Sequence, residues 1–89
     1  MLTMTQSAGA RLARKLAKKR AEENVALRFV RDATRGGWLL RLDRIQPTDV
    51  KLSHDGRTVV LLDEQVSNSL RNKRLDVKET DEGPRLKFC

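Results

Sequence analysis

Apolar and polar residues alternate in short runs along most of the chain after residue 24. Side chains in such a run point in turn to opposite faces, which is typical of strands that bury one face. These runs predict six strands. We expect them at residues 25–31, 38–44, 50–53, 58–62, 74–78 and 85–88.

Two segments have a helical pattern instead. Residues 6–21 are rich in Ala, Leu, Lys and Arg, which favour helices, and the hydroxyl of Thr5 can cap the first turn. Residues 64–70 follow Asp63, another capping residue, and place Val66 and Leu70 on one face. The chain therefore predicts a long helix before the strands and a short one between the fourth and fifth strands.

Glycines mark two connections between strands. Asp55-Gly56 separates the third and fourth strands, and this pair is typical of a tight hairpin that needs positive φ angles. Gly36 and Gly37 lie in the loop between the first two strands, where they permit similar backbone angles. We therefore expect a hairpin around Asp55-Gly56, and a second one in which residues 85–88 pair back on residues 74–78 after the turn at 81–84.

The length of 89 residues predicts one domain, at residues 1–89, with one modest core. Such a chain has little room for a deep active site, and no apolar run approaches the ~20 residues of a membrane span. The apolar positions on the inward faces predict the core residues. These are Leu12, Leu16, Leu27, Phe29, Trp38, Leu40, Leu42, Val59, Leu61, Val66, Leu70, Leu75, Val77, Leu86 and Phe88.

The net charge of +7 is concentrated near the start of the chain. Residues 1–21 contain six basic residues and no acidic one, while the rest of the chain is nearly balanced. At 100° per residue, five of these cations share one face of the predicted helix. They are Arg11, Arg14, Lys15, Lys18 and Lys19. This face can bind an anionic partner such as RNA, DNA or an acidic protein surface, or it can simply be solvated and maintain solubility.

Few residues could carry out chemistry. His54, the only histidine, sits beside the hairpin turn, where we expect a solvated side chain. Cys89 is the only cysteine and is a weak metal candidate, because a zinc site needs three or four ligands. No pair of nucleophile and base can be assigned. We therefore expect no enzymatic activity and no cofactor, and the single thiol suits a reducing cytoplasm.

Several segments in a fixed order resemble a known family. Met1-Leu2-Thr3, Ala26-Leu27-Arg28-Phe29 and the stretch from Gly56 to Phe88 are similar to the A-type iron–sulfur cluster assembly proteins, which share the HesB/IscA-like domain. The last stretch contains the family's strand ending in Asp63, the helix ending in Leu70, the Leu75-Asp76 strand and the final Leu86-Lys87-Phe88. The resemblance implies an α+β fold. It is a small, mainly antiparallel β-sandwich with an N-terminal helix and a short second helix.

The resemblance also implies where cluster ligands belong. The family has one cysteine in a loop after the first strand and a Cys-x-Cys pair after the last strand. Arg35, Gly36 and Gly37 occupy that loop here, without a thiol, and Phe88-Cys89 is the last part of the printed chain. Because an iron–sulfur cluster is generally held by about four thiolates, we expect a cysteine-poor member that binds no metal. The resemblance then implies a cytoplasmic protein that acts through a protein partner, and the family's dimers and tetramers leave a homodimer open.

Overall fold

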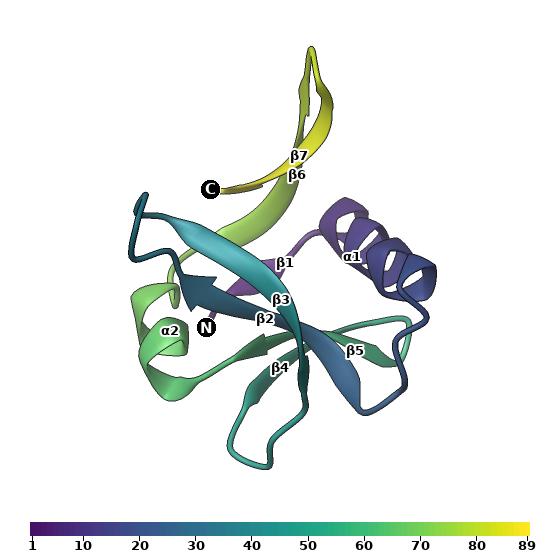
Figure 1. The fold of residues 1–89 in the computed structure, drawn as a ribbon. Helices are drawn as coiled ribbons and strands as arrows, with labels where there is room; N and C mark the ends of the chain where they lie inside the picture. The colour runs from purple at the N-terminus through teal and green to yellow at the C-terminus, as the bar shows by residue number, and fades with distance from the viewer.

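The computed structural model describes residues 1–89 and contains two helices and seven strands (Figure 1). The helices are α1 (Gln6–Lys18) and α2 (Glu64–Ser69). The strands are β1 (Thr3–Met4), β2 (Val25–Arg31), β3 (Trp38–Arg44), β4 (Val50–His54), β5 (Arg57–Leu62), β6 (Arg74–Thr80) and β7 (Gly83–Phe88). Both predicted helices and all six predicted strands are present.

Helix α1 begins as predicted and ends earlier than predicted. The hydroxyl of Thr5 accepts a hydrogen bond from the backbone N–H of Ala8, which caps the first turn. The helix stops at Lys18 because Arg20 adopts a left-handed backbone with φ of 53°. The N–H of Arg20 then bonds to the carbonyl of Ala17, and the N–H of Ala21 to that of Leu16. This pair of bonds is a Schellman motif. Helix α2 similarly ends at Ser69, one residue before its predicted end.

The larger sheet has four strands in the order β3-β2-β5-β4. Strands β2 and β3 pair antiparallel over their whole length, from Val25 opposite Arg44 to Arg31 opposite Trp38. Strand β5 pairs antiparallel with β4 through the predicted hairpin, in which Asp55 and Gly56 have φ angles of 49° and 81°. Strands β2 and β5 run parallel in the centre of the sheet.

The smaller sheet has three strands in the order β1-β6-β7. Strand β1 pairs parallel with the start of β6 and was missed by the sequence analysis. Strands β6 and β7 form an antiparallel hairpin that extends away from the rest of the molecule in Figure 1. Its tip is the exposed turn around Asp81 and Glu82, and β7 starts at Gly83, two residues earlier than predicted.

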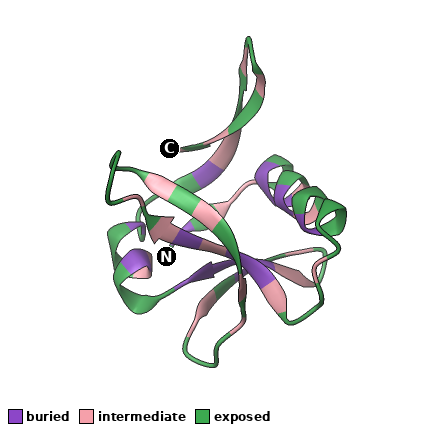
Figure 2. Ribbon diagram, viewed as in Figure 1, coloured by how far each residue is buried: buried purple, intermediate pink, exposed green.

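Helix α1 packs against both sheets, through β2, β4 and β5 of the larger one and β6 of the smaller one. It buries Ala8, Leu12 and Leu16, at i, i+4 and i+8, in the main core (Figure 2). This arrangement confirms the predicted α+β class and the packing of the first helix on a sheet face. Helix α1 therefore contacts both sheets while its charged residues stay exposed.

The predicted core is largely confirmed, with one error. Leu42 is 41% exposed and lies on β3, an edge strand of its sheet. Trp38, Leu40, Val77, Leu86 and Phe88 are partly buried and pack against the core rather than within it. The analysis also omitted buried residues, which are Leu2, Ala8, Ala26, Leu52, Val60 and Leu62.

Candidate functional site: a basic groove

A groove of about 820 Å³ lies between α1, the start of β3 and the open end of the β6–β7 hairpin, opposite its tip. Its charged lining is entirely basic and comes from α1 and β7. These residues are Arg11, Arg14, Lys15, Lys18 and Arg85. Its apolar lining comes from both sheets and the helix. These residues are Leu12, Phe29, Trp38, Leu39, Leu40, Leu75, Leu86 and Phe88. We call this feature the basic groove.

The helix supplies most of the charge of the basic groove. Arg11, Arg14, Lys15 and Lys18 follow the i, i+3, i+4, i+7 spacing that places side chains in one stripe along a helix. All four are exposed, and none forms an ion pair within the protein. Lys19, which the sequence analysis grouped with them, is the C-cap residue and does not line the groove. Their role in binding stays a prediction.

The floor of the basic groove is made by side chains from two different sheets. Phe29 of β2 and Phe88 of β7 contact each other with ring centroids 5.4 Å apart, so they join the two sheets. Trp38 stands directly opposite Arg31 in the β2–β3 register, and the guanidinium carbon of Arg31 lies 4.4 Å from the centre of the Trp38 ring. This cation–π contact covers one face of the indole. Leu39, at the rim, is 50% exposed.

Sequence reasoning missed Arg85 and the apolar floor. Arg85 is exposed on β7 and forms a surface ion pair with Glu82, three residues before it. Nothing in the alternation of β7 distinguishes Arg85 from other strand cations such as Lys87. Only the docking of the hairpin beside α1 brings Arg85 to the groove. The usable signal was the stripe on α1, which the sequence does contain.

The loop that the resemblance assigns to a cluster ligand is a self-contained turn. The carboxylate of Asp32 accepts hydrogen bonds from the N–H groups of Thr34 and Arg35, at 2.9 and 3.1 Å. The backbone of Asp32 also bonds to Gly36 and Gly37, which have φ angles of 74° and 77°. Arg35, Gly36 and Gly37 are exposed and do not line the basic groove. The turn therefore offers neither a thiol nor a free carboxylate to a metal.

Cys89 lies apart from the basic groove, in a shallow hollow of about 400 Å³. Its backbone pairs with Arg74 in both directions, which extends the β6–β7 ladder by one residue, and its thiol is exposed. The hollow is bordered by Arg71, Lys73 and Arg74. No acidic or histidine side chain borders it.

His54 is not solvated, contrary to the expectation from sequence. Its side chain is only 14% exposed because α1 covers it at Gly9. A methyl group at Gly9 would lie 2.6 Å from Nδ1 of His54, so glycine is required for this close approach. The other ring nitrogen, Nε2, lies 3.3 Å from the carboxylate of Asp55 in the hairpin turn. His54 thus helps dock the helix and is not part of a ligand cluster.

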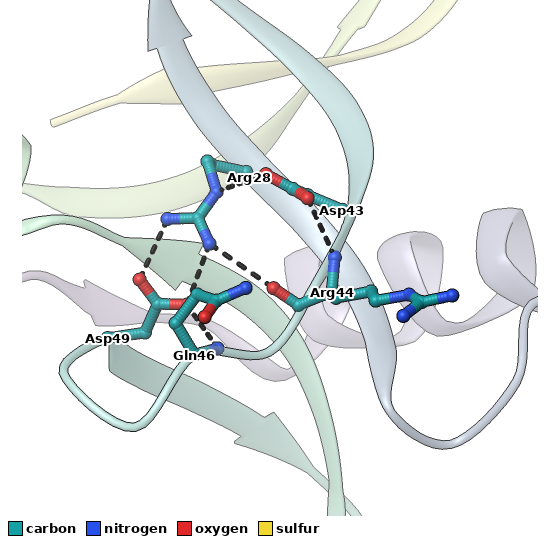
Figure 3. Close-up of polar contacts among 5 residues, drawn as sticks. All are labelled: Arg28, Asp43, Arg44, Gln46 and Asp49. Atoms are coloured by element: carbon teal, nitrogen blue, oxygen red, sulfur yellow. Dashed lines mark hydrogen bonds and ion pairs between the residues drawn. The ribbon is translucent and has the colours of Figure 1, made fainter.

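The most extensive polar network joins Arg28 of β2 to two carboxylates (Figure 3). Its guanidinium donates to Asp49 through two nitrogens, at 2.7 and 2.8 Å, and to Asp43 at 2.8 Å. These hydrogen bonds hold the pKa values of Asp49 and Asp43 below their usual range and raise that of Arg28, most strongly through Asp49. Asp49 also accepts from the N–H of Gln46. Every charge in the network is paired, so it fixes the loop between β3 and β4 and leaves no group free for a ligand.

The chemistry of these residues does not fit a metal ion or an iron–sulfur cluster. Nowhere do three or more His, Cys, Asp or Glu side chains lie close enough together to hold a metal. The one thiol stands among cations, and the charged residues that line the basic groove are all cations. Such a lining repels a metal cation and attracts carboxylate or phosphate groups.

Comparison with known proteins finds similarity in structure alone. No protein-family model and no curated protein sequence matches the chain. A crystal structure of IscA with a [2Fe-2S] cluster is 19% identical and superposes with a TM-score of 0.62, over 100% of this chain and 84% of that one. The structure of Escherichia coli SufA, a protein involved in the biosynthesis of iron–sulfur clusters, is 20% identical with a TM-score of 0.69, over 99% of this chain and 83% of that one.

The chain has the fold of the A-type iron–sulfur assembly proteins. This result confirms the HesB/IscA-like fold that the sequence resemblance implied. The superposition on the IscA structure covers the whole chain, from β1 to the β6–β7 hairpin. Neither of the two helices is both long and apolar enough to cross a lipid bilayer.

Proposed function

We propose that this protein is a non-enzymatic, cytoplasmic accessory protein related to iron–sulfur cluster assembly, which binds no cluster itself and acts by binding another protein. The proposal is supported by an IscA-type fold, together with Arg35, Gly36 and Gly37 in the loop to which the sequence resemblance assigns a family cysteine. The fold supplies the link to the pathway. The missing thiol and the lack of any three-residue ligand group argue against cluster binding.

Anaerobic reconstitution with iron and sulfide tests the loss of cluster binding. We expect no stoichiometric cluster absorbance from the purified protein after removal of unbound iron. The matched control is Cys89→Ser, which removes the only thiol and leaves the fold unchanged because the side chain is exposed. A stoichiometric absorbance that disappears in Cys89→Ser would show that this part of the proposal is wrong.

The cation stripe on α1 favours a second candidate function, which is the binding of nucleic acid or another polyanion. Arg11, Arg14, Lys15 and Lys18 are exposed and unpaired, as expected for residues that contact phosphates. If each neutralises one phosphate of a single strand, affinity falls about 50-fold between 50 and 200 mM salt. Filter binding of a single-stranded oligonucleotide at these two salt concentrations measures this. Absence of retention at the lower concentration removes the candidate.

A further inference from the structure

We propose that the basic groove is the docking site for an acidic segment of a partner protein, with the apolar side chains of that segment on the groove floor and its carboxylates against α1. The proposal rests on the protein-binding function proposed above and names the surface and the chemistry of the partner. It also requires that both features of the groove, charge and apolar floor, contribute to binding.

The charge of the groove selects an acidic occupant. Arg11, Arg14, Lys15 and Lys18 line one side, Arg85 lines the other, and no acidic residue takes part in the lining. The four helix cations have no partner within the protein, so no internal ion pair must break before they meet a carboxylate. Arg85 is held only by its exposed pair with Glu82, which is weak. The net charge of +7 also speeds the approach of an acidic partner.

The floor favours protein side chains over nucleic-acid bases. Single-stranded nucleic acids bind through open aromatic faces on which bases stack. Here Arg31 covers one face of Trp38, and Phe29 is only 4% exposed beneath Phe88. The most exposed apolar side chain of the lining is aliphatic, the half-exposed Leu39. Leucine-like side chains pack on such a surface, as they do when an amphipathic helix occupies an apolar groove.

A second copy of this chain is a poor occupant. It would bring the same net charge of +7 toward a groove that already holds five cations and no acid. A single inorganic anion is also a poor match, because a volume of about 820 Å³ with eight apolar lining residues has room for several side chains. The occupant that matches both the charge and the apolar floor of the groove is a segment with acidic and apolar residues.

The probe for this proposal is a synthetic, fluorescein-labelled amphipathic peptide of about 15 residues, with Leu at i, i+3, i+4 and i+7 and Glu on the other face. A second peptide has the same composition but distributes Leu around the helix. A single-stranded oligo(dT) is the third probe. Fluorescence anisotropy with the full chain measures all three at low and moderate salt.

Two variants and one control examine the groove itself. The double variant Lys15→Glu with Lys18→Glu reverses charge inside it, and Lys19→Glu with Lys51→Glu makes the same change in charge at exposed residues outside it. Leu39→Ser removes apolar surface without altering charge. All five residues are exposed, and thermal melting by circular dichroism verifies that each variant is folded.

We expect the wild-type protein to bind the amphipathic peptide at least about tenfold more tightly than the peptide with distributed Leu. The groove double variant should bind the amphipathic peptide about tenfold more weakly than the wild type does. The outer double variant stays within about threefold of the wild type, and Leu39→Ser weakens binding measurably. Equal binding of both peptides would overturn the proposal, since charge alone would then explain it. Tighter binding of oligo(dT) that is lost in the groove double variant would overturn it in favour of nucleic acid.

Failure of this inference differs from failure of the proposed function. If the peptide does not bind and reconstitution also yields no cluster, the groove assignment is wrong while the loss of cluster binding stands. If a Cys89-dependent cluster forms, the proposed function is wrong whatever the peptide result.

Discussion

Replacing Arg28 with Met is the most informative test of the described structure. The change keeps an unbranched apolar stem but removes the guanidinium that bonds to Asp43 and Asp49. The side chain of Asp49 is only 4% exposed, so its carboxylate would remain buried without a cation. Asp43 is 38% exposed and can regain water, so it adds little to the cost.

The expected loss is about 3 kcal/mol of unfolding free energy. Removing one partner of a buried ion pair costs about 3–5 kcal/mol. The lower end applies because Asp49 keeps its hydrogen bond from the N–H of Gln46 at 2.9 Å. With an unfolding entropy of about 2.1 cal/mol/K per residue, the 89-residue chain should melt about 15 °C lower.

Urea denaturation at neutral pH measures this loss, and a double-mutant cycle with Asp49→Asn assigns it to the pair. We expect a coupling energy above about 1 kcal/mol between Arg28 and Asp49. If Arg28→Met does not fold, Arg28→Lys replaces it, since an ammonium keeps the charge but cannot bond both carboxylates in the same geometry. A loss below about 1 kcal/mol, or strictly additive effects, would refute the reasoning.

The same variant has a predicted pH dependence. Arg28 lowers the folded-state pKa values of Asp49 and Asp43 below those of the unfolded chain. Their contribution to stability is therefore complete above the unfolded pKa of about 4 and is lost as the pH falls through the lower folded values. In Arg28→Met that contribution is absent. The stability difference between the two proteins should consequently shrink as the pH falls below about 4.

Three further predictions use the same unfolding measurements. Gly9→Ala should destabilise the protein by about 1–3 kcal/mol in spite of alanine's helix propensity, because the new methyl group would lie 2.6 Å from Nδ1 of His54. Adding His54→Ala to this variant should recover part of the lost stability. Thr5→Ala should cost about 1 kcal/mol of unfolding free energy through the lost helix cap. The pKa of Asp76 is lowered by hydrogen bonds from the N–H of Val77 and then from the hydroxyl of Thr5, so NMR titration of Thr5→Ala should show this pKa move back toward its usual value. Leu16→Ala should cost about 2–5 kcal/mol, whereas the partly exposed Leu42 tolerates the same change with a loss below about 1 kcal/mol.

Local patterns were sufficient to predict most of the elements. Alternation located the six longer strands, and side chains that cap a helix located the first residue of both helices. The end of α1 was missed because its left-handed residue is Arg20 rather than glycine, the usual residue for that position. Strand β1 was missed because two residues, Thr3 and Met4, have no detectable periodicity. Its pairing with β6 depends on contacts more than seventy residues apart in the chain.

The site was predictable only in its helical half. The stripe from Arg11 to Lys18 follows from spacing on one helix, so sequence alone could place four cations together. Arg85, Phe88 and Leu39 join that stripe through the packing of two separate sheets around α1, which no local pattern encodes. For the same reason the burial of His54 under Gly9 was unexpected. Burial of a residue beside a turn depends on which element docks over it.

The position of the basic groove connects the two proposals. Trp38 directly follows the loop of Arg35, Gly36 and Gly37, and Phe88 directly precedes Cys89. Both Trp38 and Phe88 line the groove, so its lining adjoins the two segments to which the family resemblance assigns cluster ligands. A metal there would need anionic donors, whereas the lining offers cations and apolar surface. The charges that oppose a metal are the charges that attract an acidic segment. Reversing the charges of Lys15 and Lys18 should therefore weaken binding of the acidic peptide without creating a cluster site, because that change adds no thiolate. A charge-reversed variant that gained iron binding would contradict this argument.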